Sequence, residues 1–251
     1  ESDGRAISSY RFLESAGLMH TEKLRGLALD TAVGFLQTAR DPVHTTTHIF
    51  RMLRHIEGCQ LTKKAFLELA EQAEYREIIQ QRFDPIWPSA EELRLMPPSS
   101  LGACMQKRFD VVGLHNLPPS LNEDGETWTY LANRLRRTHD FHHLILGLPD
   151  TVAGEAVASS YYACRYKNPG ALAVMSTWLA HGYIEESEND EIWSCVRFGI
   201  KLAQDLPISL LAIRWEDAWT RSVSDWRDSL GISEFLSGSP LKDRKDDWIP
   251  T

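Results

Sequence analysis

The chain has 251 residues, of which 43% are hydrophobic and 25% charged, and its formal net charge is −8. This composition is that of a globular protein with one large core. The acidic balance argues against nucleic-acid binding, which needs an excess of Lys and Arg to displace the counterions of phosphates. Four widely spaced cysteines without a CxxC pair indicate reduced, mostly buried thiols in a reducing compartment. The opening "ESDGRAISSY" has no basic flank before an apolar run, so no signal peptide is predicted.

Helical periodicity dominates the first half of the chain. It predicts helices over residues 21–40, 45–56 and 63–83, the third with Thr62 as its N-cap. Four prolines punctuate residues 84–102 and leave room there for a short helix only. Residues 113–125 are predicted to form a second loop.

The second half is predicted to be helical almost without a break. "TWTYLANRLRRTHDFHHLIL" (127–146) is one helix, "GLP" ends it, and Pro149 with Asp150 suits the start of the next. Further helices are predicted over 170–186, 188–204 and 209–230. The longest nearly uncharged stretch, 168–184, is shorter than the ~20 apolar residues of a membrane-spanning helix, so a buried helix is predicted. With no strand alternation or repeat, we expect one all-α domain, a helical bundle over 1–251 whose polar tail (239–251) is loose.

A histidine-rich stretch near the end of the helix over 127–146 is the main functional signal. On a helical wheel, His139 falls roughly 20° from the middle of the apolar stripe, His143 roughly 60° from it, and His142 roughly 40° to the other side. His139 and His143 are four residues apart, a spacing that allows both imidazoles to bind one cation. Asp140, at the edge of the buried face, is a further ligand or an acceptor that fixes a histidine tautomer. His142 is interpreted as a residue that supports the ligands or packs beside them.

Glu155 lies twelve residues after His143, beyond the predicted break between helices. If the second helix folds back on the first, Glu155 reaches the same point. Two imidazoles and two carboxylates suit Zn²⁺ or Fe²⁺, with room for water or substrate. The alternative at this stage is an incidental cluster of histidines, because most HxxxH pairs on helices bind nothing.

The pattern HDxxHx₁₁E, from His139 to Glu155, resembles the signature of the coenzyme Q (ubiquinone) biosynthesis protein four family. Two flanking stretches are also similar to that family: "YREIIQQRFDPIWPSAEELRLMPPSSLGACM" (75–105) and "RWEDAWTRSVSDWRDSLGI" (214–232). The resemblance covers roughly residues 75–232. After Glu155 the chain reads "AVASSYYACRYKNPGALAV", where the family usually has Lys, Glu and Gln. We therefore expect a divergent member, for which a bacterial source is one option.

The resemblance implies an all-helical fold and a divalent metal, Zn²⁺ first with Fe²⁺ and Mg²⁺ as alternatives, held by His139, Asp140, His143 and Glu155. It implies a hydrophobic cavity for a polyprenyl tail, for which the helices of residues 170–230 are the candidates, although ordinary core is the simpler interpretation of each residue there. It also implies a role in the oxidative decarboxylation at ring carbon C1 of a polyprenylated hydroxybenzoate, in scaffolding the quinone-making complex, or in both. Another prenylquinone precursor or an isoprenoid phosphate is an alternative ligand.

The implied partners are a prenylated quinone precursor or isoprenoid lipid, other quinone-biosynthesis proteins and a membrane surface, with no nucleic acid. The implied location is the cytoplasmic side of the inner membrane, or the mitochondrial matrix side in a eukaryote. A homodimer stays open. Two rival functions are kept: a non-catalytic lipid-binding scaffold, and an HD-type metal phosphohydrolase that would recruit His48 and Asp190 or Asp205. Arg136 and Arg137 are candidates to steer an anion, or else solvated arginines.

Overall fold

The computed structural model describes residues 22–42, 45–113 and 124–244, and confirms the all-α prediction. Extended pairing among these residues is limited to a single isolated bridge between Ser100 and Ser222. The helices are α2 (Glu22–Arg40), α3 (Thr45–Ile56), α4 (Gln60–Ala70), α5 (Arg76–Gln81), α6 (Ala90–Arg94), α7 (Leu101–Val112), α8 (Thr127–Leu146), α9 (Val152–Arg165), α10 (Pro169–Ile184), α11 (Asn189–Asp205), α12 (Val223–Ser229) and α13 (Ile232–Ser237), with 3₁₀ turns η1 (Ala73–Tyr75), η2 (Glu186–Glu188), η3 (Leu210–Ala212) and η4 (Trp215–Asp217).

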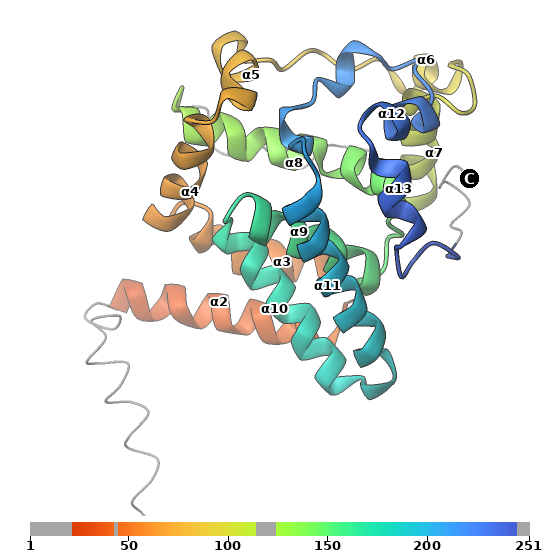
Figure 1. Cartoon of the computed structure of the whole chain (residues 1–251). Helices are drawn as coiled ribbons and strands as arrows, with labels where there is room; N and C mark the ends of the chain where they lie inside the picture. The colour runs from red at the N-terminus through yellow and green to blue at the C-terminus, as the bar shows by residue number, and fades with distance from the viewer. Residues whose placement is uncertain (1–21, 43–44, 114–123, 245–251) are drawn as a thin grey trace, which may run out of the picture.

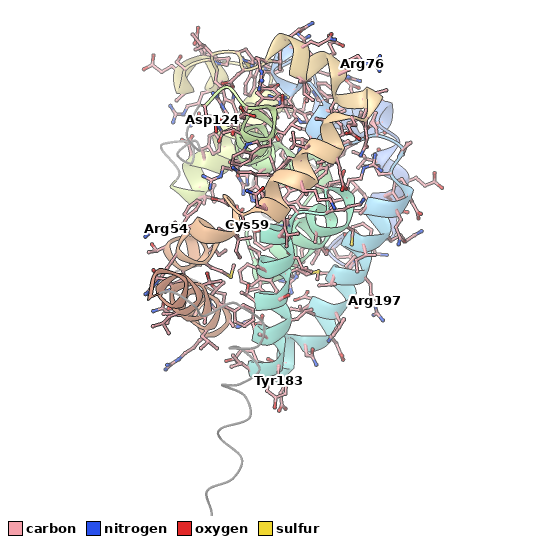
Figure 2. The ribbon with its side chains drawn as sticks, turned by 90° about the vertical axis from the view of Figure 1, so that its left-hand side faces the viewer. Arg54, Cys59, Arg76, Asp124, Tyr183 and Arg197 are labelled. Carbon is pink, nitrogen blue, oxygen red and sulfur yellow. The ribbon has the colours of Figure 1, made fainter. Side chains whose placement is uncertain are left out.

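Helices α8 to α11 form the centre of the molecule (Figure 1). The most extensive helix pair is α9 with α11, and α10 packs against both of them. The hairpin of α2 and α3 lies across α10, whereas α4 packs on α8. Figure 2 shows Cys59 where α3 gives way to α4, and Tyr183 at the far end of α10. The chain thereby surrounds α8 and α9, the two helices that carry the predicted site.

Small side chains allow α9 and α11 to approach closely. A Cβ atom added to Gly199 would lie 2.0 Å from Ser160 Oγ and 2.4 Å from the carbonyl oxygen of Val157. No real Cβ atom approaches its neighbours this closely, so only glycine fits at this crossing. The run "AVASS" in α9 supplies the complementary small surface, because every residue from 156 to 160 is buried.

The single helix predicted over 63–83 is wrong, because the chain breaks into α4, η1 and α5. Helix α4 begins earlier, with Cys59 rather than Thr62 as its N-cap, and Gln72 has extended backbone angles. The break buries Tyr75, whose hydroxyl donates to Ser209 Oγ at 2.6 Å. In one continuous helix over 63–83, the Tyr75 ring would point in another direction and lose its contact with Ser209. This contact between distant residues therefore outweighs the helical pattern of the local sequence.

The helix predicted over 209–230 is also wrong in its first half. Residues 206–222 follow an irregular path with two 3₁₀ turns, and only α12 is helical. Backbone groups that a helix would pair internally find partners on other helices. Leu211 N donates to Tyr166 Oη at 3.1 Å, and Arg134 of α8 donates to the carbonyl oxygen of Ile213 at 2.6 Å. These contacts supply hydrogen-bond partners to backbone groups whose burial without a partner would cost free energy.

Helix α7 has no counterpart among the predicted elements, and its first turn is completed by the irregular segment. The backbone N–H groups of Leu101 and Gly102 donate to the carbonyl oxygens of Arg221 and Trp219, both at 2.8 Å. Ser100 Oγ accepts from Ala103 N at 3.3 Å. Three of the four N–H groups that a helix leaves unpaired at its start are thereby satisfied.

Three further expectations concern the surface and the end of the chain. The tail, which was expected to be loose, packs against the fold at its start, because Leu241 is buried in the core and Arg244 pairs with Glu191. The rest of the tail (245–251) and most of the predicted second loop (114–123) lie outside the described residues. All four cysteines are free, but only Cys104 and Cys195 are buried. Across the helices described, none is long and apolar enough to cross a bilayer.

Candidate metal centre

The turn between α8 and α9 builds the site. Gly147 ends α8 in the left-handed region (φ 63°), and Leu148 N then donates to the carbonyl oxygen of His143 at 2.9 Å. Thr151 caps α9 by accepting from Gly154 N at 3.3 Å. A Cβ atom on Gly154 would lie 2.0 Å from the carbonyl oxygen of Pro149, so glycine is needed for this sharp reversal. The reversal brings the first turn of α9 beside the last turns of α8.

His139, His143 and Glu155 converge at this reversal. Glu155 Oε1 lies 3.6 Å from Nε2 of His139 and 3.2 Å from Nε2 of His143. One ligand atom from each residue lies within 4.8 Å of the others, and no other such group of His, Cys, Asp or Glu occurs in the described part of the chain. The His143 side chain is fully buried, whereas those of His139 and Glu155 are 33% and 29% exposed. The group is therefore anchored in the core and open to solvent on one side.

The hydrogen bonds of His143 leave Nε2 available as a ligand atom. Its Nδ1 lies 3.2 Å from the carbonyl oxygen of Leu148, which can only accept, so Nδ1 carries the proton of the neutral ring. Nε2 is buried and makes no hydrogen bond, although Glu155 Oε1 is close. A lone pair that faces a carboxylate oxygen at 3.2 Å is unfavourable unless a proton or a metal ion lies between the two atoms. The residues present thus fit a divalent metal.

The electrostatics of the group favour the ionised carboxylate. Burial would raise the pKa of Glu155, but the imidazoles of His143 and His139 outweigh it and hold the pKa well below its ordinary value. Burial would lower the pKa of His139, yet the charge of Glu155 raises it overall. For His142, burial and the neighbouring imidazoles both act downwards, so its pKa lies well below the ordinary value and the ring is neutral.

Tyr162 is a member of the site that sequence reasoning missed. Its hydroxyl lies 2.8 Å from Nδ1 of His142 and 3.2 Å from Nδ1 of His139. The available signal was its spacing: Tyr162 follows Glu155 by seven residues, two helical turns, and so shares its face of α9. The fully buried His142 thus contacts the same hydroxyl as the candidate ligand His139.

Asp140 lies beside the group but does not belong to it. Its carboxylate accepts from Arg108 of α7, a buried arginine that also donates to Asp150. Burial would lower the pKa of Arg108, but the charges of Asp140 and Asp150 raise it above the ordinary value. The structure thus places Asp140 in an ion-pair network that connects α7 to α8 through Asp140 and to the α8–α9 turn through Asp150. It brings three of the four expected ligands together.

The arginines and the residues of the rival site have separate partners. Arg136 pairs with Glu57 and Arg137 with Asp84, so neither is a simply solvated side chain. His48, Asp190 and Asp205 do not join the metal-type group found among the described residues. A surface pocket of about 600 Å³, lined by residues that include Lys63, Glu68, Asp124 and Trp128, lies between α4 and the start of α8 and does not include that group.

A second buried ion pair connects α8 to the 3₁₀ turn η4. Arg134 donates to both carboxylate oxygens of Glu216, at 2.6 and 2.9 Å, and both side chains are almost fully buried. Arg227 donates to the carbonyl oxygens of Ile145 and Leu144, at 2.9 and 3.0 Å. These contacts hold the C-terminal half of α8, and with it the histidines, in place.

Comparison with known proteins finds sequence relatives of this chain. The family model described as "Coenzyme Q (ubiquinone) biosynthesis protein Coq4" matches residues 52–235. A mitochondrial ubiquinone biosynthesis protein COQ4 of Arthroderma otae is 30% identical over 149 residues, which are 56% of this chain and 52% of the relative. The protein of the same name from Paracoccidioides brasiliensis is 27% identical over 156 residues, 58% and 51% of the two chains. The chain thus spans about half the length of the curated relatives it matches.

A solved structure extends the likeness to the fold. The crystal structure of a putative ubiquinone biosynthesis protein from Nostoc punctiforme superposes with a TM-score of 0.70 at 18% identity, covering 81% of this chain and 97% of the other. Similarity at this identity speaks for the fold alone. Because the family model covers most of the chain, including both helices of the candidate site, the chain belongs to the coenzyme Q (ubiquinone) biosynthesis protein Coq4 family.

Proposed function

We propose that the protein acts in coenzyme Q biosynthesis through a divalent metal held by His139, His143 and Glu155. The observation that carries this proposal is the convergence of these three side chains, two from α8 and one from α9, whose ligand atoms lie within 4.8 Å of one another. Two histidine nitrogens and one glutamate oxygen are a donor set that catalytic zinc uses, with a fourth position open for water or substrate. Zn²⁺ is the proposed ion, and Fe²⁺ and Mg²⁺ are the alternatives.

Asp140 enters the proposal as a partner of Arg108 rather than as a fourth ligand. Its carboxylate would have to leave a buried arginine before it could bind a metal, and that would leave a charge without its partner. The network of Arg108, Asp140 and Asp150 instead connects α7 to α8 and to the turn between α8 and α9, the two helices that carry the three proposed ligands.

The proposed ligand is a polyprenylated ring precursor or an isoprenoid with an anionic head group. A carboxylate or phosphate can reach the group from the side where His139 and Glu155 are partly exposed. When bound, the metal supplies a Lewis acid that stabilises negative charge on the oxygens of the head group. The buried face of His143 excludes water from the opposite side. The proposed chemistry is oxidative decarboxylation at C1: the carboxyl group leaves as CO₂, a hydroxyl group takes its place on the ring, and molecular oxygen is the oxidant. Helices α10 and α11 remain the candidates to line a cavity for the tail.

The setting of this activity is part of the same proposal. The matched curated relatives are named mitochondrial, and the polyprenyl tail of the proposed ligand is apolar. We therefore expect peripheral membrane contact and work beside other quinone-biosynthesis proteins, on the matrix or cytoplasmic side. A homodimer remains a prediction.

Metal analysis of the purified protein tests the site. Wild-type protein should carry about one divalent ion per chain after exposure to zinc. His143→Ala and Glu155→Gln should lose it with their helix content nearly unchanged, whereas the control His48→Ala, which changes a partly buried histidine on α3, should retain it. Absence of any bound divalent ion from the wild type would refute the proposal.

Turnover separates an enzyme from a scaffold. A polyprenylated hydroxybenzoate with a ¹³C-labelled carboxyl group is incubated with the zinc-, iron- or magnesium-loaded protein under oxygen. Release of ¹³CO₂ that depends on His143 supports the decarboxylase. Stable binding of the lipid without release favours the non-catalytic lipid-binding scaffold.

A further inference from the structure

We propose that Tyr162 is a positioning residue of the metal centre, which couples the tautomer of His139 to that of His142. Its hydroxyl, supplied by α9, stands between the Nδ1 atoms of two rings supplied by α8, at 3.2 and 2.8 Å. This inference rests on the proposed function only where it treats His139 as a ligand.

The coupling follows from counting hydrogens. A phenol has one hydrogen, so the Tyr162 hydroxyl can donate to only one of the two Nδ1 atoms. The other Nδ1 must then carry a proton and donate to the phenolic oxygen, because two lone pairs facing each other in a buried site are unfavourable. If both Nδ1 atoms carried protons, the buried hydroxyl would find no other acceptor among the described residues that it contacts. Neutral His139 and His142 are therefore in opposite tautomers.

Metal binding decides which ring takes which tautomer. Nε2 of His139 is the atom that faces Glu155, so ligation requires a free lone pair on Nε2 and a proton on Nδ1. Nδ1–H of His139 then donates to Tyr162, and Tyr162 donates to Nδ1 of His142. The proton of His142 is consequently on Nε2, a buried atom that makes no hydrogen bond.

The tautomers of the two proposed histidine ligands are thus fixed by different hydrogen-bond partners. The carbonyl oxygen of Leu148 can only accept, so it imposes Nδ1–H on His143 without reference to any side chain. His139 depends on a hydroxyl that can both donate and accept. Packing holds this hydroxyl in place, because the Tyr162 ring stacks on Tyr166 with centroids 5.7 Å apart and meets Tyr161 edge-on at 5.8 Å.

Removal of one hydroxyl tests the inference. Tyr162→Phe keeps the ring and its stacking but removes the bridge between the two histidines. Tyr161→Phe is the matched control: this neighbouring buried tyrosine accepts from Leu210 N at 3.4 Å and has no hydrogen bond with either histidine. Loss of an outer partner of a metal ligand costs roughly 10- to 100-fold in affinity. We expect that loss of zinc affinity in Tyr162→Phe, measured by chelator competition, and wild-type affinity in Tyr161→Phe.

A spectroscopic readout tests the coupling apart from metal binding. In protein labelled with ¹⁵N-histidine, two-bond ¹H–¹⁵N correlations report the tautomer of each ring. His139 and His142 should have opposite tautomers in wild type and in Tyr161→Phe. In Tyr162→Phe the tautomer of one ring should no longer depend on that of the other. Identical tautomers in the wild type, or wild-type zinc affinity in Tyr162→Phe, would overturn the inference. If the wild type binds no zinc but the tautomers are opposite, the proposed function fails while the coupling through Tyr162 stands.

Discussion

Replacement of Asp140 by Asn should lower the stability of the fold and leave zinc affinity nearly unchanged. The Asp140 carboxylate is buried and accepts from buried Arg108, and a hydrogen bond between charged groups contributes ~1.5–3 kcal/mol. Arg108 keeps a second partner in Asp150, which is 26% exposed, so we expect a loss of about 2 kcal/mol rather than the ~3–5 kcal/mol of a buried charge left alone. In a chain of this size, each kcal/mol shifts Tm by ~2–4 °C, so Tm should fall by ~4–8 °C.

The reciprocal change should cost more. Arg108→Met leaves Asp140 buried with no cation, for which ~3–5 kcal/mol is expected. The double variant should lose less than the sum of the two single losses, because the second change removes the charge that the first one left unpaired. Asp110→Asn is the control: Asp110 pairs with Arg94 at the surface, at 2.6 Å with both side chains about half exposed. It also accepts from Gln106 at 2.8 Å, a bond that the Asn oxygen can still accept, so this change should cost less than either buried change.

Urea denaturation followed by circular dichroism in the presence of EDTA measures these differences without metal. Chelator competition then measures the zinc affinity of the same variants. If Asp140→Asn unfolds at the same urea concentration as the wild type but binds zinc ten-fold or more weakly, Asp140 is a ligand, as the family resemblance implied. The reasoning from the ion pair is then refuted.

Two further predictions concern packing and thiol reactivity. Gly199→Ala should destabilise the fold by ~1–3 kcal/mol or more in urea, because its Cβ would overlap the facing helix. Gly58→Ala, with no atom within 4 Å of the new Cβ, should be close to neutral. Equal stability of the two variants would contradict the close α9–α11 contact. Burial raises the pKa of the Cys195 thiol to about 12. At pH 8, iodoacetamide should therefore modify exposed Cys164 and spare Cys195 until the protein unfolds. Peptide mass mapping that finds early labelling of Cys195 would contradict this and show that its surroundings open.

Much of the candidate site was predictable because its elements are local. The stretch 127–146 forms one helix as predicted, since its apolar residues repeat at helical spacing and Gly147 allows the left-handed end. Two histidines four residues apart necessarily share a helix face. Glu155 needed only the expectation that the next helix folds back after a short turn.

Other features could not be read from local patterns. The unbroken helices predicted over 63–83 and 209–230 fail because Tyr75 and the backbone of residues 210–213 bond to distant residues, and those bonds outweigh helix propensity. Asp140 and Glu155 looked equivalent as carboxylate ligands, yet Arg108, 32 residues before Asp140, pairs with one and not the other.

The sequence by itself determined the all-helical class, the family and the helix face that carries the histidines, because composition, motif and the 3.6-residue period of a helix are properties of neighbouring residues. Only the tertiary structure decided which carboxylate meets the imidazoles, that Tyr162 joins them, and where the long helices break. These outcomes depend on which buried polar groups find partners across the core, and that is settled by the packing of whole helices against one another.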